Sequence, residues 1–369
     1  MKLLSIQPSS IYENGGSGRV LRRLFHGKEK KITAIYVSPS ISKPKEGLIT
    51  EIRINWHPLH RKWVRWKFRN IFSYLRMTLG KRLVEKRLLA IIKDLEFDVI
   101  HIINHGKFCA FLSKSRGDLL HNKSIWVSFH DHYSLCSTFE DTKFLWNSAK
   151  KRFCISQELG NEYQRLFGSL PFEVITDGIY MMERSQPLRH IDDKQFVVYF
   201  AGLLHIDYYP NFKALAKALN MIAEEGVSIK LILRGTQKLN FLNDVKFRVV
   251  YNSDFVSDEE IKKEIDAATI LYLPMKFTVP EFYLYSMSTK MISYLTAKGS
   301  IFYHGPENSA AANLLHKWDA ATICESLNVT EVKDDLLLCL RDINQHSSNA
   351  KELARDQFNM NEILDKFWN

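Results

Sequence analysis

Cysteine is scarce in this chain, and its distribution excludes two kinds of covalent support. The 369 residues include five cysteines, at Cys109, Cys136, Cys154, Cys324 and Cys339. They form no CxxC pair and their number is odd, which argues against a disulfide framework and against a structural zinc site. A reducing cytoplasm suits such a chain best.

Long hydrophobic runs are also missing. No segment approaches the roughly 20 apolar residues that a membrane-spanning helix needs, so we expect no integral membrane protein. The apolar start Met1–Pro8 is too short for the hydrophobic region of a signal peptide and indicates a first buried strand. We expect a cytoplasmic protein, either free or attached peripherally to the inner face of the membrane.

Acidic residues are nearly absent from the segment Arg61 to Arg87. It holds ten Lys or Arg and a single acid, Glu85, with interleaved aromatic residues such as Trp63 and Trp66. This pattern suits an anionic membrane surface. It also fits a helix that packs its aromatic residues on its own domain and exposes its charges to water. Nucleic acid is not expected as a partner, because no recognised binding motif accompanies the basic stretch.

Short apolar runs alternate with longer amphipathic segments from one end of the chain to the other. That alternation is typical of parallel sheets with crossover helices. Strands are expected at Lys2–Gln7, Ile32–Val37, Val99–Ile103, Ile125–Phe129, Arg152–Ile155, Glu173–Ile175, Phe196–Phe200, Ile229–Leu233, Arg248–Tyr251, Ile270–Leu273, Ile301–Tyr303 and Ala321–Cys324. Helices are expected near Gly18–Phe25, Tyr74–Lys93, Glu158–Phe167, Asn211–Ala223, Asp258–Ala267, Thr289–Ala297 and Ser309–Lys317, followed by two further stretches.

The length predicts two domains, since 369 residues exceed the usual size of one core. Between Asp177 and Lys194 the apolar periodicity lapses, as in a linker. We predict an α/β fold of two Rossmann-like doubly wound domains that face each other across a cleft. The first spans 1–180 and the second 181–350, while 351–369 forms a helix that completes the second domain or packs back on the first.

Two segments precede predicted helices and could bind anions there. They are Gly15-Gly16-Ser17-Gly18 and Ser286-Met287-Ser288-Thr289-Lys290. The first amides of a helix have no partner within it, and the macrodipole leaves them partly positive, so they hold a phosphate or carboxylate well. The glycines allow close approach of the backbone to a bound group. Alternatively, the first segment is a simple turn and the hydroxyls of the second only cap its helix.

His130 and Asp131 directly follow the apolar strand 125–129, so both side chains should emerge at its carboxyl end. A histidine in such a place can hydrogen-bond a hydroxyl or handle a proton near neutral pH. Together with His132, the pair could instead indicate a metal, but no fourth ligand is in view. We therefore expect chemistry that requires no metal and no bound cofactor.

In order and spacing, these motifs resemble those of GT-B glycosyltransferases, and most closely the retaining family 4 enzymes of the capsule and lipopolysaccharide type. The resemblance covers nearly the whole chain through the glycine loop, His130-Asp131, Ile155-Ser156, Thr176-Asp177-Gly178-Ile179 and the block from Ser286 to Pro306. It implies that the glycine loop faces the donor phosphate and the acceptor, and that His130 lies beside the transferred sugar. It also implies that Ser286, Ser288, Thr289 and Lys290 hold the donor diphosphate.

The chain departs from that family at its phosphate-binding positions. Similar enzymes place an arginine and a lysine after the glycine that matches Gly202, where this sequence has Leu203 and Tyr208. They also carry a pair of glutamates where it has Tyr285 and Ser293. Four basic residues could substitute at the leaving group, of which the last is the most natural: His205, Lys213, Arg234 and Lys290.

Recognition of the nucleobase is expected from the segments that follow two other strands of the second domain. Arg234 and Gly235 lie in one of them and Phe255 in the other. Phe255 could stack on the base or belong to the core.

The resemblance predicts a glycosyltransferase that moves a sugar from a nucleotide diphosphate donor to a glycan or lipid-linked acceptor, with retention, in the synthesis of cell-surface polysaccharide. His130, Asp131 and Lys290 are the predicted catalytic residues. A sugar-nucleotide epimerase or a phosphorylase is a rival with the same fold. A degenerate transferase that acts as a scaffold is a rival of another class, suggested by the missing arginine, lysine and glutamates.

Overall fold

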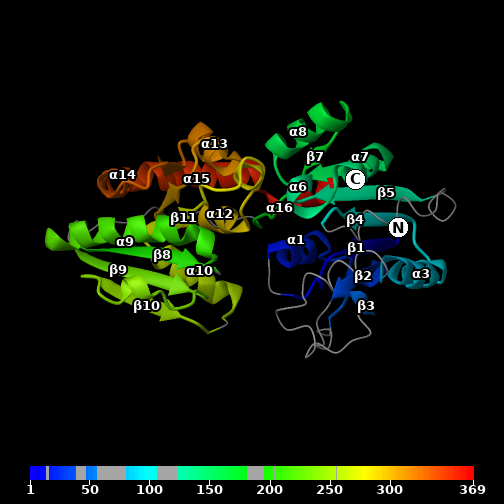
Figure 1. Cartoon of the computed structure of the whole chain (residues 1–369), viewed down its shortest axis with the longest axis horizontal. Coiled ribbons are helices and arrows are strands. Elements are labelled where there is room, and N and C mark those ends of the chain that lie inside the picture. The colour runs from blue at the N-terminus through cyan, green and yellow to red at the C-terminus, as the bar shows by residue number, and fades with distance from the viewer. Residues whose placement is uncertain are drawn as a thin grey trace. The chain divides into compact units, whose positions relative to one another are not determined.

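The structure is a computed structural model that describes residues 1–13, 16–38, 47–55, 80–105, 123–180, 195–202, 204–254 and 256–369. The predictions for Gly15, for Phe255 and for most of the basic segment lie outside the described residues. The chain divides into two compact units (Figure 1), which are Met1–Thr176 with Leu364–Asn369, and Asp177–Ile363. We call them the N-terminal and C-terminal units.

The N-terminal unit is built on a seven-stranded parallel sheet with the strand order β3-β2-β1-β4-β5-β6-β7. The strands are β1 (Leu3–Gln7), β2 (Ile32–Ser38), β3 (Thr50–Asn55), β4 (Val99–Ile103), β5 (Ser124–Phe129), β6 (Lys151–Cys154) and β7 (Glu173–Val174). The helices are α1 (Gly16–Leu24), α3 (Gly80–Lys93), α6 (Tyr133–Cys136), α7 (Phe139–Ser148) and α8 (Gln157–Phe167), with a short 3-10 turn at Glu29–Lys31. All residues of β1 and β4 are buried, as expected of central strands covered on both faces.

The C-terminal unit repeats this design on a six-stranded parallel sheet with the order β10-β9-β8-β11-β12-β13. Its strands are β8 (Gln195–Ala201), β9 (Ser228–Arg234), β10 (Arg248–Asn252), β11 (Ile270–Pro274), β12 (Ser300–His304) and β13 (Ala321–Cys324). Its helices are α9 (Tyr209–Glu224), α10 (Asp258–Ala267), α11 (Pro280–Tyr283), α12 (Thr289–Tyr294), α13 (Ala310–Lys317), α14 (Val329–Arg341) and α15 (Ile343–Gln357), with 3-10 turns at Ile206–Tyr208 and Asn240–Leu242. The final helix, α16 (Met360–Trp368), spans the boundary between the units. Two doubly wound domains were predicted, and both are confirmed.

Alternate residues of β8 show how this second core is layered. Phe200 packs with α9 and α14 in one cluster, whereas Tyr199 packs with α12, α13 and α15 in the other. Successive side chains of a strand point to opposite faces, so the apolar run of β8 fills both layers at once.

Helix starts follow from capping side chains in the sequence. The Oγ of Ser156 accepts a hydrogen bond from Leu159 N at 3.1 Å at the start of α8, and Ser257, Ser309 and Asn328 cap α10, α13 and α14 in the same way. Caps of this kind also explain α7, which was not predicted. Thr138 accepts from Asp141 N at 3.1 Å there.

The last residues of the chain return to the N-terminal unit, within which the letter C marks the chain end in Figure 1. The ring of Phe367 lies 4.9 Å from that of Phe153 and 5.3 Å from that of His101, measured between centroids. Trp368 Nε1 donates to Leu24 O at 2.8 Å. Only Leu364–Asn369 belongs to this unit, because α15 and the start of α16 remain with the second.

Several local predictions differ from the structure. The strand β3 and the helices α6 and α7 were missed, and three helices follow Asn328 where two were expected. Helix α12 ends at Tyr294 and not at Ala297, and beyond it Thr296 Oγ1 bonds the Ser293 carbonyl oxygen at 3.3 Å. A side-chain hydroxyl that bonds the backbone in this way competes with helix propagation.

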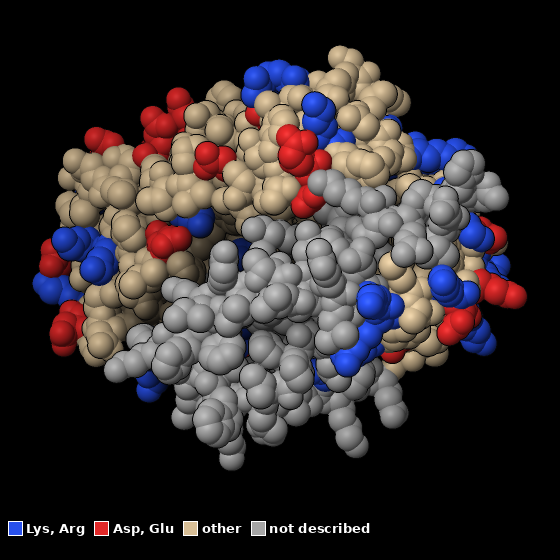
Figure 2. All heavy atoms as spheres, turned by 45° about the vertical axis from the view of Figure 1, so that its right-hand side comes forward, with Lys and Arg blue, Asp and Glu red and all other residues tan. Residues whose placement is uncertain are grey.

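Charges of both signs are interspersed over the described surface of the face shown in Figure 2. Of the basic segment, Lys86 and Arg87 lie on α3 and are exposed. In the described ranges, no helix is both long enough and apolar enough to cross a membrane.

Candidate functional site

In each sheet the strand order reverses at one position, the topological switch point. On one side of it each following strand is added outward in one direction, and on the other side in the opposite direction. In the C-terminal unit this point lies between β8 and β11. Ligands of doubly wound sheets bind outside the carboxyl ends of the strands at such a point. Gly202 follows β8 directly, so it marks this place in the structure.

Lys290 meets Gly202 at this edge. A Cβ atom built on Gly202 would lie 3.2 Å from Lys290 Nζ, and the φ of Gly202 is +133°, which favours glycine. The Lys290 ammonium lies 3.8 Å from the centroid of the Phe200 ring, close enough for a cation–π contact. The missing side chain at position 202 therefore leaves the room that the lysine occupies.

The electrostatic setting of Lys290 suits the binding of an anion. Burial lowers the pKa of its ammonium to about 7, and no carboxylate in the described parts of the chain pairs with it. Even a partly buried ammonium is costly when it has no counter-charge. A bound anion would remove that cost and raise the pKa again, since an opposite charge favours the protonated form.

The hydroxyl groups before α12 do not act as the capping alternative predicts, and their role on the diphosphate stays a prediction. Ser288 is the residue before the helix and its side chain makes no capping hydrogen bond. The Ser286 Oγ is buried and, counting the described residues, has no hydrogen-bond partner. Thr289 is the first residue of α12, and its carbonyl accepts from Ser293 Oγ at 3.2 Å. Capping alone does not account for these serines.

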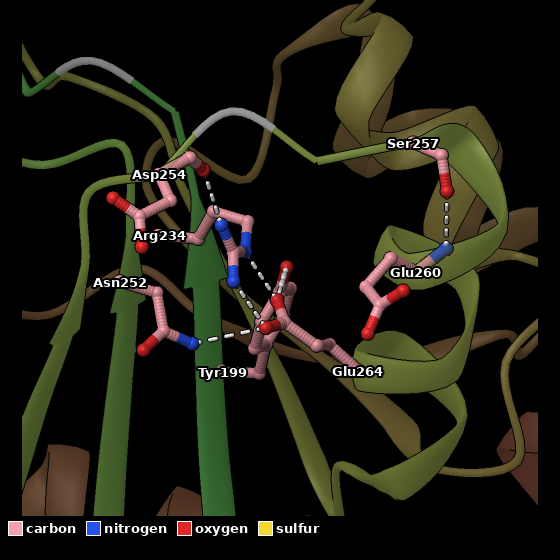
Figure 3. Close-up of polar contacts among 7 residues, drawn as sticks. All are labelled: Tyr199, Arg234, Asn252, Asp254, Ser257, Glu260 and Glu264. Carbon is pink, nitrogen blue, oxygen red and sulfur yellow. Dashed lines mark hydrogen bonds and ion pairs between the residues drawn. The ribbon is translucent and has the colours of Figure 1, made fainter.

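Arg234, predicted as a phosphate or base contact, is turned toward a glutamate. Figure 3 shows its guanidinium donating to both carboxylate oxygens of Glu264, and Nη1 donating to Asp254 O at 2.7 Å. The same carboxylate accepts from the Tyr199 hydroxyl and from Asn252 Nδ2, each at 2.9 Å. Its pKa is lowered, chiefly by the hydrogen bonds from Arg234.

His205 is also engaged by a carboxylate. Its Nδ1 lies 3.2 Å from Asp207 Oδ2, and Lys276 Nζ lies 3.3 Å from the same oxygen. Lys276 follows β11 and therefore stands on the other side of the switch point from Gly202. The sequence prediction missed it, although its place two residues after an apolar strand was a usable signal.

Gly235 and Thr236 follow β9 and form hydrogen bonds with residues at the ends of β10 and β8. Gly202 N donates to Arg234 O at 2.9 Å, and Thr236 Oγ1 donates to Gly202 O at 2.9 Å. Gly235, with φ of +68°, donates its N–H to Asn252 O at 2.8 Å. A left-handed residue is needed here, which glycine supplies without strain.

In the N-terminal unit the predicted glycine loop forms the start of a helix. Gly16, Ser17 and Gly18 are the first residues of α1. A Cβ on Gly18 would lie 2.8 Å from the carbonyl oxygens of both Ile11 and Glu13, so this glycine is required for packing against its own loop. That the segment faces a ligand stays a prediction.

That loop is fixed by a residue the sequence analysis missed, Glu51 on β3. Its Oε2 accepts from Ser10 Oγ at 2.6 Å and its Oε1 accepts from Ile11 N at 2.7 Å. Tyr12 N donates in turn to Ser10 Oγ at 3.1 Å. Burial raises the pKa of Glu51, although both hydrogen bonds oppose the shift.

His130 and Asp131 emerge after β5, as predicted from the strand. Burial lowers the pKa of His130 to about 4, with the Asp131 charge opposing this shift. Asp131 Oδ2 lies 3.3 Å from Nδ1 of His105, which follows β4 and was not predicted. At neutral pH His130 is therefore an uncharged imidazole beside a carboxylate, able to donate or accept one hydrogen bond at each nitrogen.

Comparison with known proteins identifies the fold. Neither a protein-family model nor a curated protein sequence matches the chain. Sucrose-phosphate synthase from Thermosynechococcus elongatus has a TM-score of 0.68 at 13% identity, covering 100% of this chain and 97% of its own. The Anabaena protein HepE, solved with UDP and glucose, has a TM-score of 0.65 at 12% identity, with 100% and 98% covered.

A third similar structure is an alpha,alpha-trehalose-phosphate synthase (UDP-forming) from Burkholderia vietnamiensis, with a TM-score of 0.64 at 10% identity. It covers 100% of this chain and 98% of its own. At such low identities the likeness shows the fold alone. The predicted GT-B fold is confirmed, whereas the resemblance to retaining family 4 stays a prediction.

Proposed function

We propose that this protein is a glycosyltransferase that uses a nucleotide diphosphate sugar as donor. The observation that carries the proposal is the partly buried ammonium of Lys290 at the switch point of the C-terminal sheet, which no carboxylate among the described residues pairs. A diphosphate is the anion that a GT-B fold with such a site would take. Two similar structures support the same interpretation: HepE was solved with UDP, and the trehalose-phosphate synthase is described as UDP-forming.

The reaction we propose is transfer of the sugar to a hydroxyl of a glycan or lipid-linked acceptor. The acceptor oxygen forms a bond to the anomeric carbon, and the bond from that carbon to the diphosphate oxygen breaks. The diphosphate leaves with the electron pair, and the acceptor proton passes to a phosphate oxygen. Lys290 would stabilise the charge that develops on the leaving group, which is the largest contribution expected in such a reaction.

No side chain acts as a strong base in this proposal, and the anomeric configuration is retained. His130 is uncharged at neutral pH, which suits a hydrogen bond to a sugar hydroxyl better than proton donation. The N-terminal unit would bind the acceptor and the C-terminal unit the nucleotide. No metal ion is required, so activity should survive chelation with EDTA.

The proposal can be tested by measuring the proton that the Lys290 amine should take up when a nucleotide diphosphate binds. With a pKa of about 7, Lys290 is mostly neutral at about pH 8, so binding of a diphosphate should take up close to one proton. Calorimetric titration with UDP, GDP and CMP in buffers of different ionisation enthalpy measures that proton. Lys290→Met should abolish the uptake, whereas Lys217→Met, an exposed lysine on α9, should leave it unchanged.

Two results would count against the proposal. One is the absence of binding by every nucleotide tried. The other is nucleotide binding with a proton uptake that Lys290→Met does not alter, because the anion would then lie elsewhere.

A non-catalytic binding protein is the second candidate. It is favoured by the positions at which the chain lacks the arginine, lysine and glutamates of similar retaining family 4 enzymes. Ser293, which stands where the family has a glutamate, bonds the backbone of its own helix. Turnover of a matched donor and acceptor by the wild-type protein would remove this candidate. Hydrolysis or interconversion of the donor without acceptor would instead indicate the epimerase or phosphorylase alternative.

A role at the inner face of the membrane, in cell-surface polysaccharide synthesis, also belongs to the proposal. It rests on the basic and aromatic composition of the segment Arg61 to Arg87. Co-sedimentation with anionic vesicles but not with neutral ones is the expected result. Equal pelleting with both would remove the electrostatic part of this proposal.

A further inference from the structure

The carboxylate of Glu264 has its acceptor capacity filled by protein groups. Four donors reach it, two from Arg234 and one each from Tyr199 and Asn252. A carboxylate offers about four lone-pair sites, so this one has none left for a ligand. Glu264 therefore acts on its neighbours and does not bind a substrate itself.

The groups that Glu264 holds belong to consecutive strands at one edge of the sheet. Tyr199 comes from β8, Arg234 from β9 and Asn252 from β10, while Glu264 comes from α10 (Figure 3). The side chains of Arg234 and Glu264 are only 11% and 19% exposed, so water does little to loosen the pair. Bidentate pairs between arginine and a carboxylate are also geometrically specific.

This network fixes the turn Asn252–Asp254 at both ends. Asn252 is bonded directly to Glu264, and the Asp254 carbonyl is bonded to Arg234. Ser253 and Asp254 are nevertheless exposed. Figure 3 shows the Asp254 carboxylate pointing away from the guanidinium. The turn thus presents accessible polar groups on a backbone that hydrogen bonds hold near each end.

The same network continues to the site of Lys290. The backbone of Arg234 accepts a hydrogen bond from Gly202 N, and Gly202 lies against the Lys290 ammonium. The turn and the Lys290 site therefore lie at the carboxyl ends of three hydrogen-bonded strands, β8, β9 and β10.

We propose that Glu264 is a positioning residue that, through Arg234 and Asn252, holds the Asn252–Asp254 turn in place to contact the base of a bound nucleotide. Arg234 then serves the same purpose and is not itself a ligand of the diphosphate. This inference rests on the proposed function, because it assumes that a nucleotide occupies the Lys290 site. Preorganised polar groups reduce the ordering cost of binding and sharpen discrimination between ligands.

The experiment compares ligands with and without a base on the full-length chain. Affinities for UDP, GDP, ADP, CDP and inorganic pyrophosphate are measured for the wild type, Glu264→Gln, Tyr199→Phe and Lys262→Gln. Lys262 pairs with Asp266 on the exposed side of the same helix and is the control. Tyr199→Phe removes one donor from Glu264 at constant shape, so it serves if Glu264→Gln folds poorly.

Glu264→Gln should lower the affinity for the preferred nucleoside diphosphate by about tenfold and change the affinity for pyrophosphate by less than about twofold. Tyr199→Phe should act in the same direction by about threefold, and Lys262→Gln should have no effect. In Glu264→Gln and in Tyr199→Phe, the ratio of the affinities for the best and the poorest nucleoside diphosphate should shrink. This criterion can be applied even if pyrophosphate binds too weakly to measure.

Three outcomes separate the ideas. An equal loss for nucleotides and pyrophosphate, with the base ratio unchanged, would mean that Glu264 only supports the fold, and it would overturn the inference. Wild-type nucleotide binding that neither variant alters would overturn it too, while leaving the proposed function intact. Failure of the wild type to bind any nucleotide would overturn both.

Discussion

The loop after β1 and the turn after β10 are each held by one glutamate, and the two glutamates differ in what surrounds them. Glu51 receives one hydroxyl and one backbone amide, and burial raises its pKa. Glu264 receives four donors that include a guanidinium, and these lower its pKa. The same way of fixing a loop thus uses two neutral donors at Glu51 and a guanidinium with two neutral donors at Glu264.

This difference has consequences for stability. Around Glu264, loss of the carboxylate leaves a guanidinium with only 11% exposure and several donors without partners. Around Glu51, loss of the carboxylate leaves two neutral donors, the Ser10 hydroxyl and the Ile11 amide, without that acceptor. Removing one partner of a buried charge pair is much more costly than removing a neutral hydrogen bond.

The largest effect is expected from Glu264→Ala. It should lower the free energy of unfolding by about 3 kcal/mol, because the Arg234 guanidinium loses its counter-charge in a poorly solvated place. Urea denaturation measures the change, and Lys262→Ala on the same helix should stay within about 0.5 kcal/mol of wild type. Equal effects of the two substitutions would show that the Arg234 pair contributes nothing beyond a surface ion pair.

Next in size is Gly18→Ala, which tests the loop held by Glu51. The added methyl group would meet the Ile11 and Glu13 carbonyl oxygens at 2.8 Å, so we expect a loss of about 2 kcal/mol. Gly27→Ala is the control, since its Cβ meets nothing within 4 Å and only its φ of +77° is unfavourable. A cost for Gly18→Ala no greater than that of the control would mean that this loop yields readily.

A smaller pair of changes compares one serine from each region. Ser10→Ala removes a hydrogen bond to a carboxylate and should cost about 1.5 kcal/mol, whereas Ser257→Ala removes the cap of α10 and should cost about 1 kcal/mol. Thermal unfolding of both variants measures the difference. The reverse order would show that the loop after β1 is less firmly held than its hydrogen bonds suggest.

Much of the fold could be read from the sequence because the central strands are continuous apolar runs. Val99–Ile103 and Ala321–Cys324 were predicted to the residue, since each has apolar character and clear flanks. The strand β3 was missed because Thr50–Asn55 alternates polar and apolar residues over a short length. Helix α7 was missed as well, although Thr138 followed by Glu140 and Asp141 is a recognisable start.

The candidate site was less predictable because partners distant in sequence decide it. Lys290 was selected by its place beside a helix start, and its role on the diphosphate stays a prediction. Nothing local shows that Arg234 is committed to Glu264, thirty residues away. Glu51 was missed for the same reason, since its bonds to Ser10 and Ile11 span forty residues or more. Strand order brings these groups together, and the order follows from the whole chain.

The smallest of these effects is a difference between Glu51 and Glu264 in how the free energy of unfolding depends on pH. The raised pKa of Glu51 means that the folded state keeps its proton while the unfolded state has released it, so stability falls as pH rises above the usual glutamate range. The lowered pKa of Glu264 has the opposite sign, because its contribution is present at neutral pH and is lost as pH falls through the folded-state value. Relative to wild type, Glu51→Gln should therefore gain stability with rising pH, and Glu264→Gln should gain it with falling pH. Urea unfolding from about pH 3 to about pH 8 tests the two slopes, and slopes of the same sign would contradict the electrostatic contrast between the two loops.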